Sequence, residues 1–221
     1  MPLTGSLDAD GWVRVAGERV VRADEVPLPG RHMLADVLGA AVAASLAGAH
    51  GPAVGDAIRG FGGVPHRLET IAVRDGVRWV NDSQATIPVA AIAALEAFDA
   101  PIVLIAGGRG KNLDMTDLAR EVAARAEYVL LIGEAADEFE RLFKAAGAQH
   151  IERAASLEDA VARGHAIAQQ LGGGTVLMSP AATSFDMFAD YAARGAAFKA
   201  AVRDLATRRG AERDADKDAG R

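Results

Sequence analysis

From Leu68 onward, short apolar segments alternate with longer segments of helical periodicity, and this alternation limits the possible folds more than any other feature of the sequence. Strands that alternate with helices form a mostly parallel sheet with helices on both faces, which is an α/β domain. The turn between the first two strands is predicted at Asp75-Gly76. The predicted strands are 69–74, 77–80, 101–106, 128–132, 150–153 and 175–179, and the predicted helices are 88–98, 115–126, 135–146, 157–171 and 185–205.

The segment before this domain has a different pattern. Residues 12–28 alternate apolar and polar side chains around Gly17, which predicts two short strands in a hairpin. Helices are predicted from about 34 to 46 and from 54 to 61. This stretch is too small to bury two strands and two helices well, and the hairpin would leave strand edges open. We therefore expect residues 1–64 to complete a domain whose main body lies outside this sequence, and the open edges to favour association.

Composition and charge exclude several classes of function for this protein. The net charge of −6 argues against a broad nucleic-acid-binding surface. The chain has no cysteine, which excludes disulfides, thiol nucleophiles and zinc–thiolate sites. No apolar run approaches the roughly 20 residues that span a bilayer, and the N-terminus does not resemble a signal peptide. We expect a cytosolic protein without membrane or nucleic-acid partners, and a disordered tail at residues 207–221.

Three polar segments each follow a predicted strand. They are "NDSQAT" (residues 81–86), "GGRGKN" (residues 107–112) and "SPAATSFD" (residues 179–186). Ligands of open parallel sheets bind beyond the carboxyl ends of the strands. These three turns are therefore expected to surround one pocket.

The segment "GGRGKN" is similar to a phosphate loop but does not match one. Ile105 occupies the position of the first glycine, and Asn112 replaces the hydroxyl residue that would reach Mg²⁺. Leu113 occupies the position of the last glycine in the dinucleotide motif. The segment remains a glycine-rich turn that places Lys111 at a helix start, which suits a carboxylate or phosphate. A strand-to-helix turn with a solvated lysine is the alternative.

The remaining polar segments match no known hydrolase or metal-binding pattern. "SPAATSFD" holds more hydroxyl groups than helix capping needs, but the G-x-S-x-G motif of a hydrolase is absent. The five histidines show no metal-ligand spacing. In "PHRLE", His66 and Arg67 follow a proline, and the arginine could clamp a phosphate or have a structural role.

Five segments, in the same order and at similar spacing, resemble the C-terminal part of the D-glutamate-adding members of the Mur ligase family. They are "GRHMLADVLGAA", "GVPHRLE", "WVNDSQAT", "IAGGRGKNLD" and "LMSPAATSFDMFADYAARGAAF". The resemblance implies an ATP-dependent amide ligase that joins D-glutamate to UDP-N-acetylmuramoyl-L-alanine in peptidoglycan synthesis. It implies small-molecule substrates and a monomeric full-length enzyme.

The same resemblance implies a division into domains. Residues 65–206 would form the Rossmann-like, amino-acid-binding C-terminal domain, and residues 1–64 the end of the central ATPase domain. The phosphate loop, the Mg²⁺ ligands and the UDP-binding domain of the family are not found in this sequence. The chain alone is therefore expected to be incomplete for catalysis with ATP and Mg²⁺, either as a truncated protein or as one read from an internal start.

Individual residues take their expected roles from the family's motifs. The positions that match the D-glutamate site are Lys111, Thr86, Ser184 and Tyr191. The positions that match nucleotide contacts are Arg67, Asp82, His66, His32 and Asp36. No metal ligand is expected among these residues.

The sequence departs from the family pattern at four of its positions. The family often has asparagine where Met33 and Asp36 stand, near the expected adenine contacts. It often has lysine where Gln84 stands, and phenylalanine where Tyr191 stands. With Gln84 in place of lysine, a site that is expected to bind anions has one positive charge fewer.

Two other interpretations remain open. The chain could be a stand-alone Rossmann-like module that binds an acidic amino acid or nucleotide without catalysis. It could also belong to a related amino-acid ligase, such as a folylpolyglutamate synthetase. The D-N-P-R-type motif of ligases that add meso-diaminopimelate is absent, which favours D-glutamate.

Overall fold

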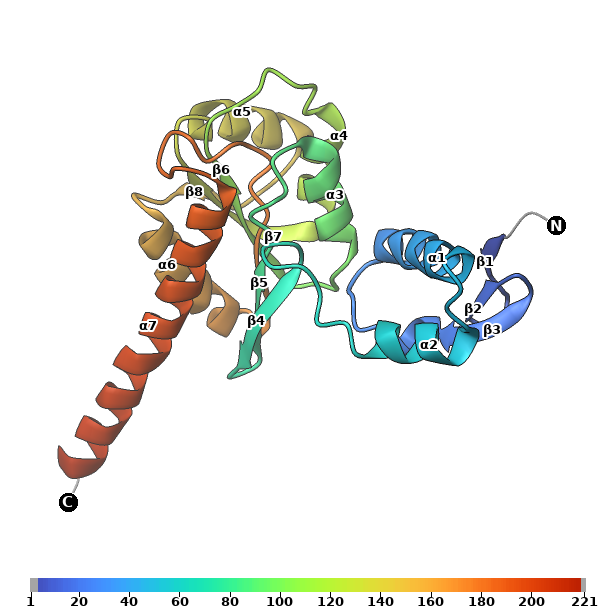
Figure 1. Cartoon of the computed structure of the whole chain (residues 1–221). Helices are drawn as coiled ribbons and strands as arrows, with labels where there is room; N and C mark the ends of the chain where they lie inside the picture. Colours follow the sequence, from blue (N-terminus) through green and yellow to red (C-terminus); the bar gives the residue numbers. More distant parts are fainter. Residues whose placement is uncertain (1–3, 220–221) are drawn as a thin grey trace. The chain divides into compact units, whose positions relative to one another are not determined.

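The computed structural model describes the backbone of residues 4–219 and divides the chain into two compact units, Met1–Val64 and Pro65–Arg221. Each unit has its own sheet (Figure 1). The side chains of Ala206 and of the residues beyond Thr207 lie outside the described part of the chain.

The second unit is built on a six-stranded sheet in the order β4-β5-β9-β6-β7-β8. Only β4 is antiparallel to its neighbour, and the other four strand pairs are parallel. The predicted mostly parallel sheet is therefore confirmed. The strands are β4 (Glu69–Arg74), β5 (Val77–Asn81), β6 (Ile102–Gly107), β7 (Ala126–Ile132), β8 (Ile151–Arg153) and β9 (Gly174–Met178).

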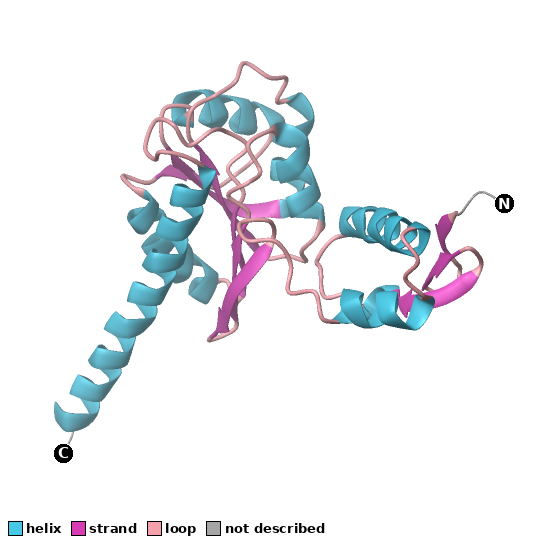
Figure 2. Cartoon of the chain, viewed as in Figure 1, coloured by secondary structure: helices cyan, strands magenta, loops and turns pink. Residues whose placement is uncertain are grey.

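Helices cover both faces of this sheet, as the alternation predicted. Figures 1 and 2 show α3, α4 and α5 on one face and α6 and α7 on the other. Val103 and Ile105 of β6 pack into the core under α6 and α7. Leu104 is equally buried, although its side chain points to the opposite face. The helices are α3 (Pro88–Glu96), α4 (Thr116–Arg125), α5 (Ala136–Ala146), α6 (Leu157–Gln170) and α7 (Tyr191–Ala219).

Local sequence explains where these helices begin. The hydroxyl of Ser156 accepts a hydrogen bond from the Asp159 N–H at 3.2 Å and caps α6. One face of α6 is apolar at helical spacing, so burial of that face holds the helix on the sheet. Its buried apolar side chains are Leu157, Ala160, Val161 and Ala168.

The last helix differs from its prediction at both ends. It begins at Tyr191 rather than at residue 185, because Asp190 accepts a hydrogen bond from the Ala193 N–H at 2.7 Å and starts the helix there. It also continues through residues 207–219, where a disordered tail was predicted. This segment contains three Ala, three Arg and three Asp and no proline, which is compatible with a helical backbone. Residues 220 and 221 of the predicted tail lie outside the described residues.

The first unit contains the predicted hairpin and one further strand, β1, that pairs with it in the antiparallel order β1-β2-β3. It has a small core, whose buried side chains are Val13, Val15, Val20, Val21, Val26, Val37, Ala41 and Val54. Leu46 and Phe61 are exposed, and the expectation that this unit completes a larger domain stays a prediction. The elements are β1 (Gly5–Leu7), β2 (Trp12–Val15), β3 (Glu18–Arg22), the 3-10 turn η1 (Ala23–Glu25), α1 (Arg31–Leu46) and α2 (Gly51–Arg59).

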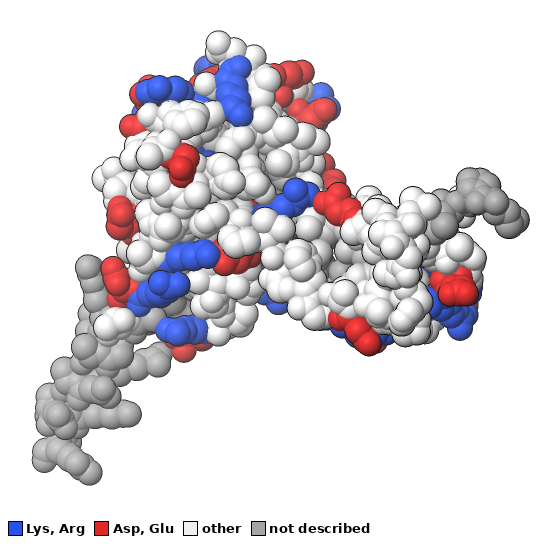
Figure 3. All heavy atoms as spheres, in the orientation of Figure 1, with Lys and Arg blue, Asp and Glu red and all other residues white. Residues whose placement is uncertain are grey.

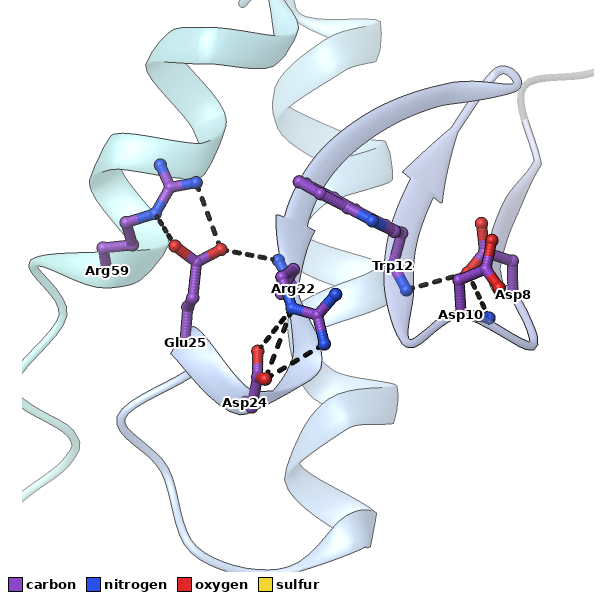
Figure 4. Close-up of polar contacts among 7 residues, drawn as sticks. All are labelled: Asp8, Asp10, Trp12, Arg22, Asp24, Glu25 and Arg59. Atoms are coloured by element: carbon purple, nitrogen blue, oxygen red, sulfur yellow. Dashed lines mark hydrogen bonds and ion pairs between the residues drawn. The ribbon is translucent and has the colours of Figure 1, made fainter.

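Surface ion pairs tie the end of β3 to α2 (Figure 4). Glu25 accepts a hydrogen bond from the Arg22 N–H at 2.9 Å and pairs with Arg59 at 3.1 Å. Arg22 also pairs with Asp24 at 3.0 Å. These groups are well exposed, so solvent screens their charges and each pair contributes little to the stability of the unit.

Two further observations concern the distribution of charge and the length and apolarity of the helices. On the face drawn in Figure 3, basic and acidic side chains are interspersed. Among the described residues, no helix is both long enough and apolar enough to cross a membrane.

Candidate functional site

The three polar turns lie side by side because of the strand order. β9 lies between β5 and β6, so the turns that follow these strands are neighbours at one edge of the sheet. Backbone hydrogen bonds join them: the Asp82 N–H donates to the Met178 carbonyl at 2.8 Å, and the Gly107 N–H donates to the Pro180 carbonyl at 2.9 Å. The turns therefore meet at the carboxyl ends of the strands, and the expectation that they surround one pocket stays a prediction.

The first and second turns are linked by side chains. Lys111 Nζ donates a hydrogen bond to Thr86 Oγ1 at 3.1 Å. Lys111 is exposed and Thr86 is half-buried. A small hollow beside Lys111 is lined also by Asn112, Phe139 and Ala181. An accessible ammonium and a hydroxyl thus lie together at the sheet edge, where they could bind a carboxylate or phosphate.

The second and third turns pair through their backbones. The Arg109 N–H donates to the Thr183 carbonyl at 2.9 Å, and the Thr183 N–H donates to the Arg109 carbonyl at 3.0 Å. Gly108 has a φ of 129°, and a Cβ at this position would collide with the Thr183 carbonyl. The glycines of the second turn therefore allow close backbone approach. Ser184 follows Thr183 and is buried.

Tyr191 lies at the start of α7 with 40% of its surface exposed. Its carbonyl accepts a hydrogen bond from Ser83 Oγ at 2.8 Å, which attaches the start of α7 to the first turn. Thr86 and Lys111 are in direct contact, whereas Ser184 and Tyr191 lie in the neighbouring turn and helix start. That all four bind D-glutamate stays a prediction.

Asp82 is buried and both of its carboxylate oxygens are engaged. Oδ1 accepts from the Leu68 N–H at 3.1 Å, and Oδ2 accepts from Ser179 Oγ at 2.7 Å. Burial raises the pKa of Asp82 from 3.8 to about 6, although both hydrogen bonds and the charge of Arg67 act in the opposite direction. In this structure Asp82 joins the segment before β4 to the third turn, and its predicted nucleotide contact stays a prediction.

The other predicted nucleotide residues are divided between the two units. His66, which is half-buried, and Arg67, which is exposed, begin the second unit. His32 and Asp36 are exposed on α1 of the first unit, four residues apart and therefore on one helix face. Met33, between them, is buried in the first unit.

Arg194 was missed by the sequence analysis, although it is fully buried beside the site. Its guanidinium donates to the carbonyls of Ser83 and Ala182 at 2.9 and 3.1 Å, and to Ser83 Oγ at 2.9 Å. Burial lowers the pKa of Arg194 to about 10, so it is charged at neutral pH. The available signal was its helical spacing with Phe198 and Val202, which places an arginine on an apolar helix face.

Asn81, directly after the "VRWV" strand, was also not assigned a role. It is fully buried, and its amide contacts both His66 and Glu69. In the described part of the chain, no group of three or more acidic or histidine side chains could hold a metal ion.

The second unit is thus an α/β domain with an exposed lysine and several hydroxyl groups at the carboxyl edge of its sheet. A buried arginine, Arg194, lies beneath them. The sequence profile of the Mur ligase, glutamate ligase domain matches residues 66–182, which is just over half of the chain. The chain belongs to the Mur ligase family.

Curated relatives give the same family. This chain is 40% identical to UDP-N-acetylmuramoylalanine--D-glutamate ligase of Nitrosococcus oceani, over 88% of this chain and 42% of the relative. It is 44% identical to the Symbiobacterium thermophilum enzyme of the same name, over 88% of this chain and 43% of the relative. The chain therefore spans about two fifths of the length of the relatives that it matches.

Solved structures share the fold. Mycobacterium tuberculosis folylpolyglutamate synthase, complexed with ADP and AMPPCP, is 18% identical with a TM-score of 0.64, over 88% of this chain and 46% of that chain. UDP-N-acetylmuramate-alanine ligase from Thermotoga maritima is 18% identical with a TM-score of 0.60, over 85% of this chain and 41% of that chain. Both agree with the predicted fold class.

Proposed function

We propose that this chain carries the amino-acid-binding part of a cytosolic, ATP-dependent amide ligase that adds D-glutamate to UDP-N-acetylmuramoyl-L-alanine in peptidoglycan synthesis. Family membership and the names of the curated relatives support the proposal. The observation that carries it is the contact between Lys111 Nζ and Thr86 Oγ1, which joins two turns at the sheet edge.

The chemistry of the ligand fits this edge. D-glutamate carries two carboxylates at neutral pH, which require positive charge and hydrogen-bond donors. Lys111 supplies the ammonium, and Thr86, Ser184 and Tyr191 supply hydroxyl donors. Thr86 Oγ1 accepts from Lys111, so its own proton is free to donate to a carboxylate.

The role of these residues in the reaction is to position the amine. In the proposed reaction the D-glutamate nitrogen attacks the carbonyl carbon of an acyl phosphate. A C–N bond forms, the C–O bond to phosphate breaks, phosphate leaves with the electron pair, and the nitrogen loses a proton. Holding both carboxylates fixes the direction of the amine and removes much of the entropic cost of the encounter.

Five residues are proposed to contact ATP. Arg67 has the planar donor fork that suits a phosphate, and His66 lies next to it in the sequence. The full proposed set is Arg67, Asp82, His66, His32 and Asp36. The described residues hold no group of three or more acidic or histidine side chains that could bind a metal ion.

Calorimetric titration of the chain with D-glutamate tests the proposal. Lys111→Ala removes a charge-assisted contact and is expected to weaken binding about tenfold or more. Lys144→Ala is the matched control, because Lys144 is an exposed lysine of α5 that pairs with Glu140. Equal affinity of the wild type and the Lys111→Ala variant would remove Lys111 from the site, and an absence of D-glutamate binding would contradict the proposed function.

A further inference from the structure

Asn81 makes a buried set of contacts next to His66. Its Nδ2 lies 2.9 Å from His66 Nδ1, 3.2 Å from Glu69 Oε2 and 3.4 Å from the Gly195 carbonyl. Its Oδ1 accepts a hydrogen bond from the Ser83 N–H at 3.2 Å. The side chain is fully buried, so these protein groups are its hydrogen-bonding environment.

The orientation of the Asn81 amide follows from the chemistry of its partners. A backbone N–H can only donate, so the atom facing Ser83 must be the amide oxygen. A carbonyl and a carboxylate can only accept, so the atom facing Gly195 and Glu69 must be the NH₂ group. A flipped amide would place its oxygen against two acceptors and its NH₂ against a donor.

Glu69 is an acceptor in this arrangement because it is ionised. Burial raises the pKa of Glu69, but hydrogen bonds from Lys199 and from the His66 N–H, together with nearby positive charge, leave the pKa below its ordinary value. Lys199 Nζ lies 2.6 Å from Glu69 Oε1. The carboxylate therefore accepts from Asn81, His66 and Lys199 and offers no proton to the amide.

The position of the Asn81 amide bears on which nitrogen of the His66 ring carries the proton. The Asn81 NH₂ group has two protons, and its two shortest contacts are His66 Nδ1 at 2.9 Å and Glu69 Oε2 at 3.2 Å. The contact with Nδ1 is a hydrogen bond only if this nitrogen carries a lone pair, which in the neutral ring leaves the proton on Nε2. If Nδ1 carried the proton, two hydrogen-bond donors would face each other, which is unfavourable. Turning the ring over would place a carbon against the amide and remove the acceptor at 2.9 Å.

The backbone around His66 keeps the ring in this place. The His66 carbonyl accepts from the Gln84 N–H at 3.0 Å, and the His66 N–H donates to Glu69 Oε2 at 3.0 Å. Gly195 of α7 lies directly against the ring, and a Cβ there would collide with Nδ1. Tyr191 approaches the ring edge-on, with centroids 6.3 Å apart.

We propose that Asn81 is a positioning residue that holds His66 as the neutral Nε2–H tautomer, so that Nε2 is a hydrogen-bond donor for an oxyanion. The use of this donor by a nucleotide phosphate rests on the proposed function. The other neutral tautomer would present a lone pair from Nε2 and repel the same oxyanion.

The tautomer can be read directly by NMR of the full 221-residue chain labelled with ¹⁵N-histidine. The long-range proton–nitrogen spectrum separates a ring nitrogen that carries a proton from one that carries a lone pair, and His66→Gln assigns the His66 signals. At neutral pH we expect a lone-pair Nδ1 and a protonated Nε2. A protonated Nδ1, or a mixture of tautomers, in the wild type would overturn the proposal.

Two amide-to-carboxylate substitutions in the same turn test whether Asn81 sets the tautomer of His66. Asn81→Asp replaces the donor by an acceptor and is expected to bring a proton onto His66 Nδ1. Gln84→Glu adds a carboxylate to the same turn without replacing the amide that contacts the ring, and is expected to leave the lone pair on Nδ1. An Asn81→Asp spectrum equal to that of the wild type would show that Asn81 does not set the tautomer.

The ligand-free spectrum decides the tautomer independently of the proposed function. Addition of ATP to the wild-type chain then tests the use of the donor, and a selective shift of the Nε2–H signal is expected. If the tautomer is as inferred and ATP leaves this signal unchanged, the positioning role of Asn81 is supported and the nucleotide contact of His66 is wrong.

Discussion

At the scale of single residues, Asp82 gives the sharpest prediction about pH. Its pKa is raised from 3.8 to about 6 by burial, so the folded protein holds this proton more tightly than the unfolded chain. The resulting stabilisation is fully present below about pH 4 and is lost as the pH rises through about 6. The loss amounts to about 3 kcal/mol in the free energy of unfolding.

Asp82→Asn isolates this contribution, because the amide can still accept from Leu68 and donate to Ser179 without being ionised. Unfolding by urea, followed by the fluorescence of buried Trp79 in a Trp12→Phe background, reports on the second unit. The wild type is expected to lose stability relative to the Asp82→Asn variant between pH 4 and 7. A difference that is independent of pH would show that Asp82 ionises normally in the folded chain.

Gln84 is the residue whose charge departs most from the family pattern. It is half-buried in the turn that carries Thr86, and the site that we propose binds a dianion. Gln84→Lys adds a positive charge to this turn and is expected to tighten D-glutamate binding about threefold, with less effect at high salt. Gln84→Met is the uncharged control in the same calorimetric titration. Unchanged affinity in the Gln84→Lys variant would place this side chain outside the site.

At the scale of elements, Arg194 connects the start of α7 to the first and third turns. Arg194→Met would leave the carbonyls of Ser83 and Ala182 without their donor, and an unsatisfied buried group costs about 1–3 kcal/mol. We expect about 3 kcal/mol less stability and faster amide hydrogen exchange in both turns. Arg203→Met, at an exposed position of the same helix, is the control. Equal exchange in the two variants would contradict the connecting role of Arg194.

The types of the helices and strands could be predicted from the sequence, whereas the order of the strands in the sheet could not. Strand and helix types followed from periodicity, because burial on two sheet faces forces apolar runs such as residues 102–107. The insertion of β9 between β5 and β6 was not predicted, since strand order depends on packing between distant segments. The family resemblance implied one site for Lys111 and Thr86, but it did not predict their hydrogen bond. Asn81 and Arg194 were missed because their roles depend on partners that are distant in sequence, such as His66 and Ala182.

At the scale of the whole molecule, the division at Val64 and Pro65 falls within the proposed nucleotide set, because only His32 and Asp36 of that set belong to the first unit. All four proposed D-glutamate residues lie in the second unit, which has its own sheet and core. A chain that begins at Pro65 is therefore expected to bind D-glutamate within about twofold of the full chain. Its affinity for ATP is expected to fall, because His32 and Asp36 are removed with the first unit. Calorimetry of both chains, each with and without Lys111→Ala, measures these changes, and a loss of D-glutamate binding in a folded shorter chain would show that residues 1–64 contribute to the amino-acid site.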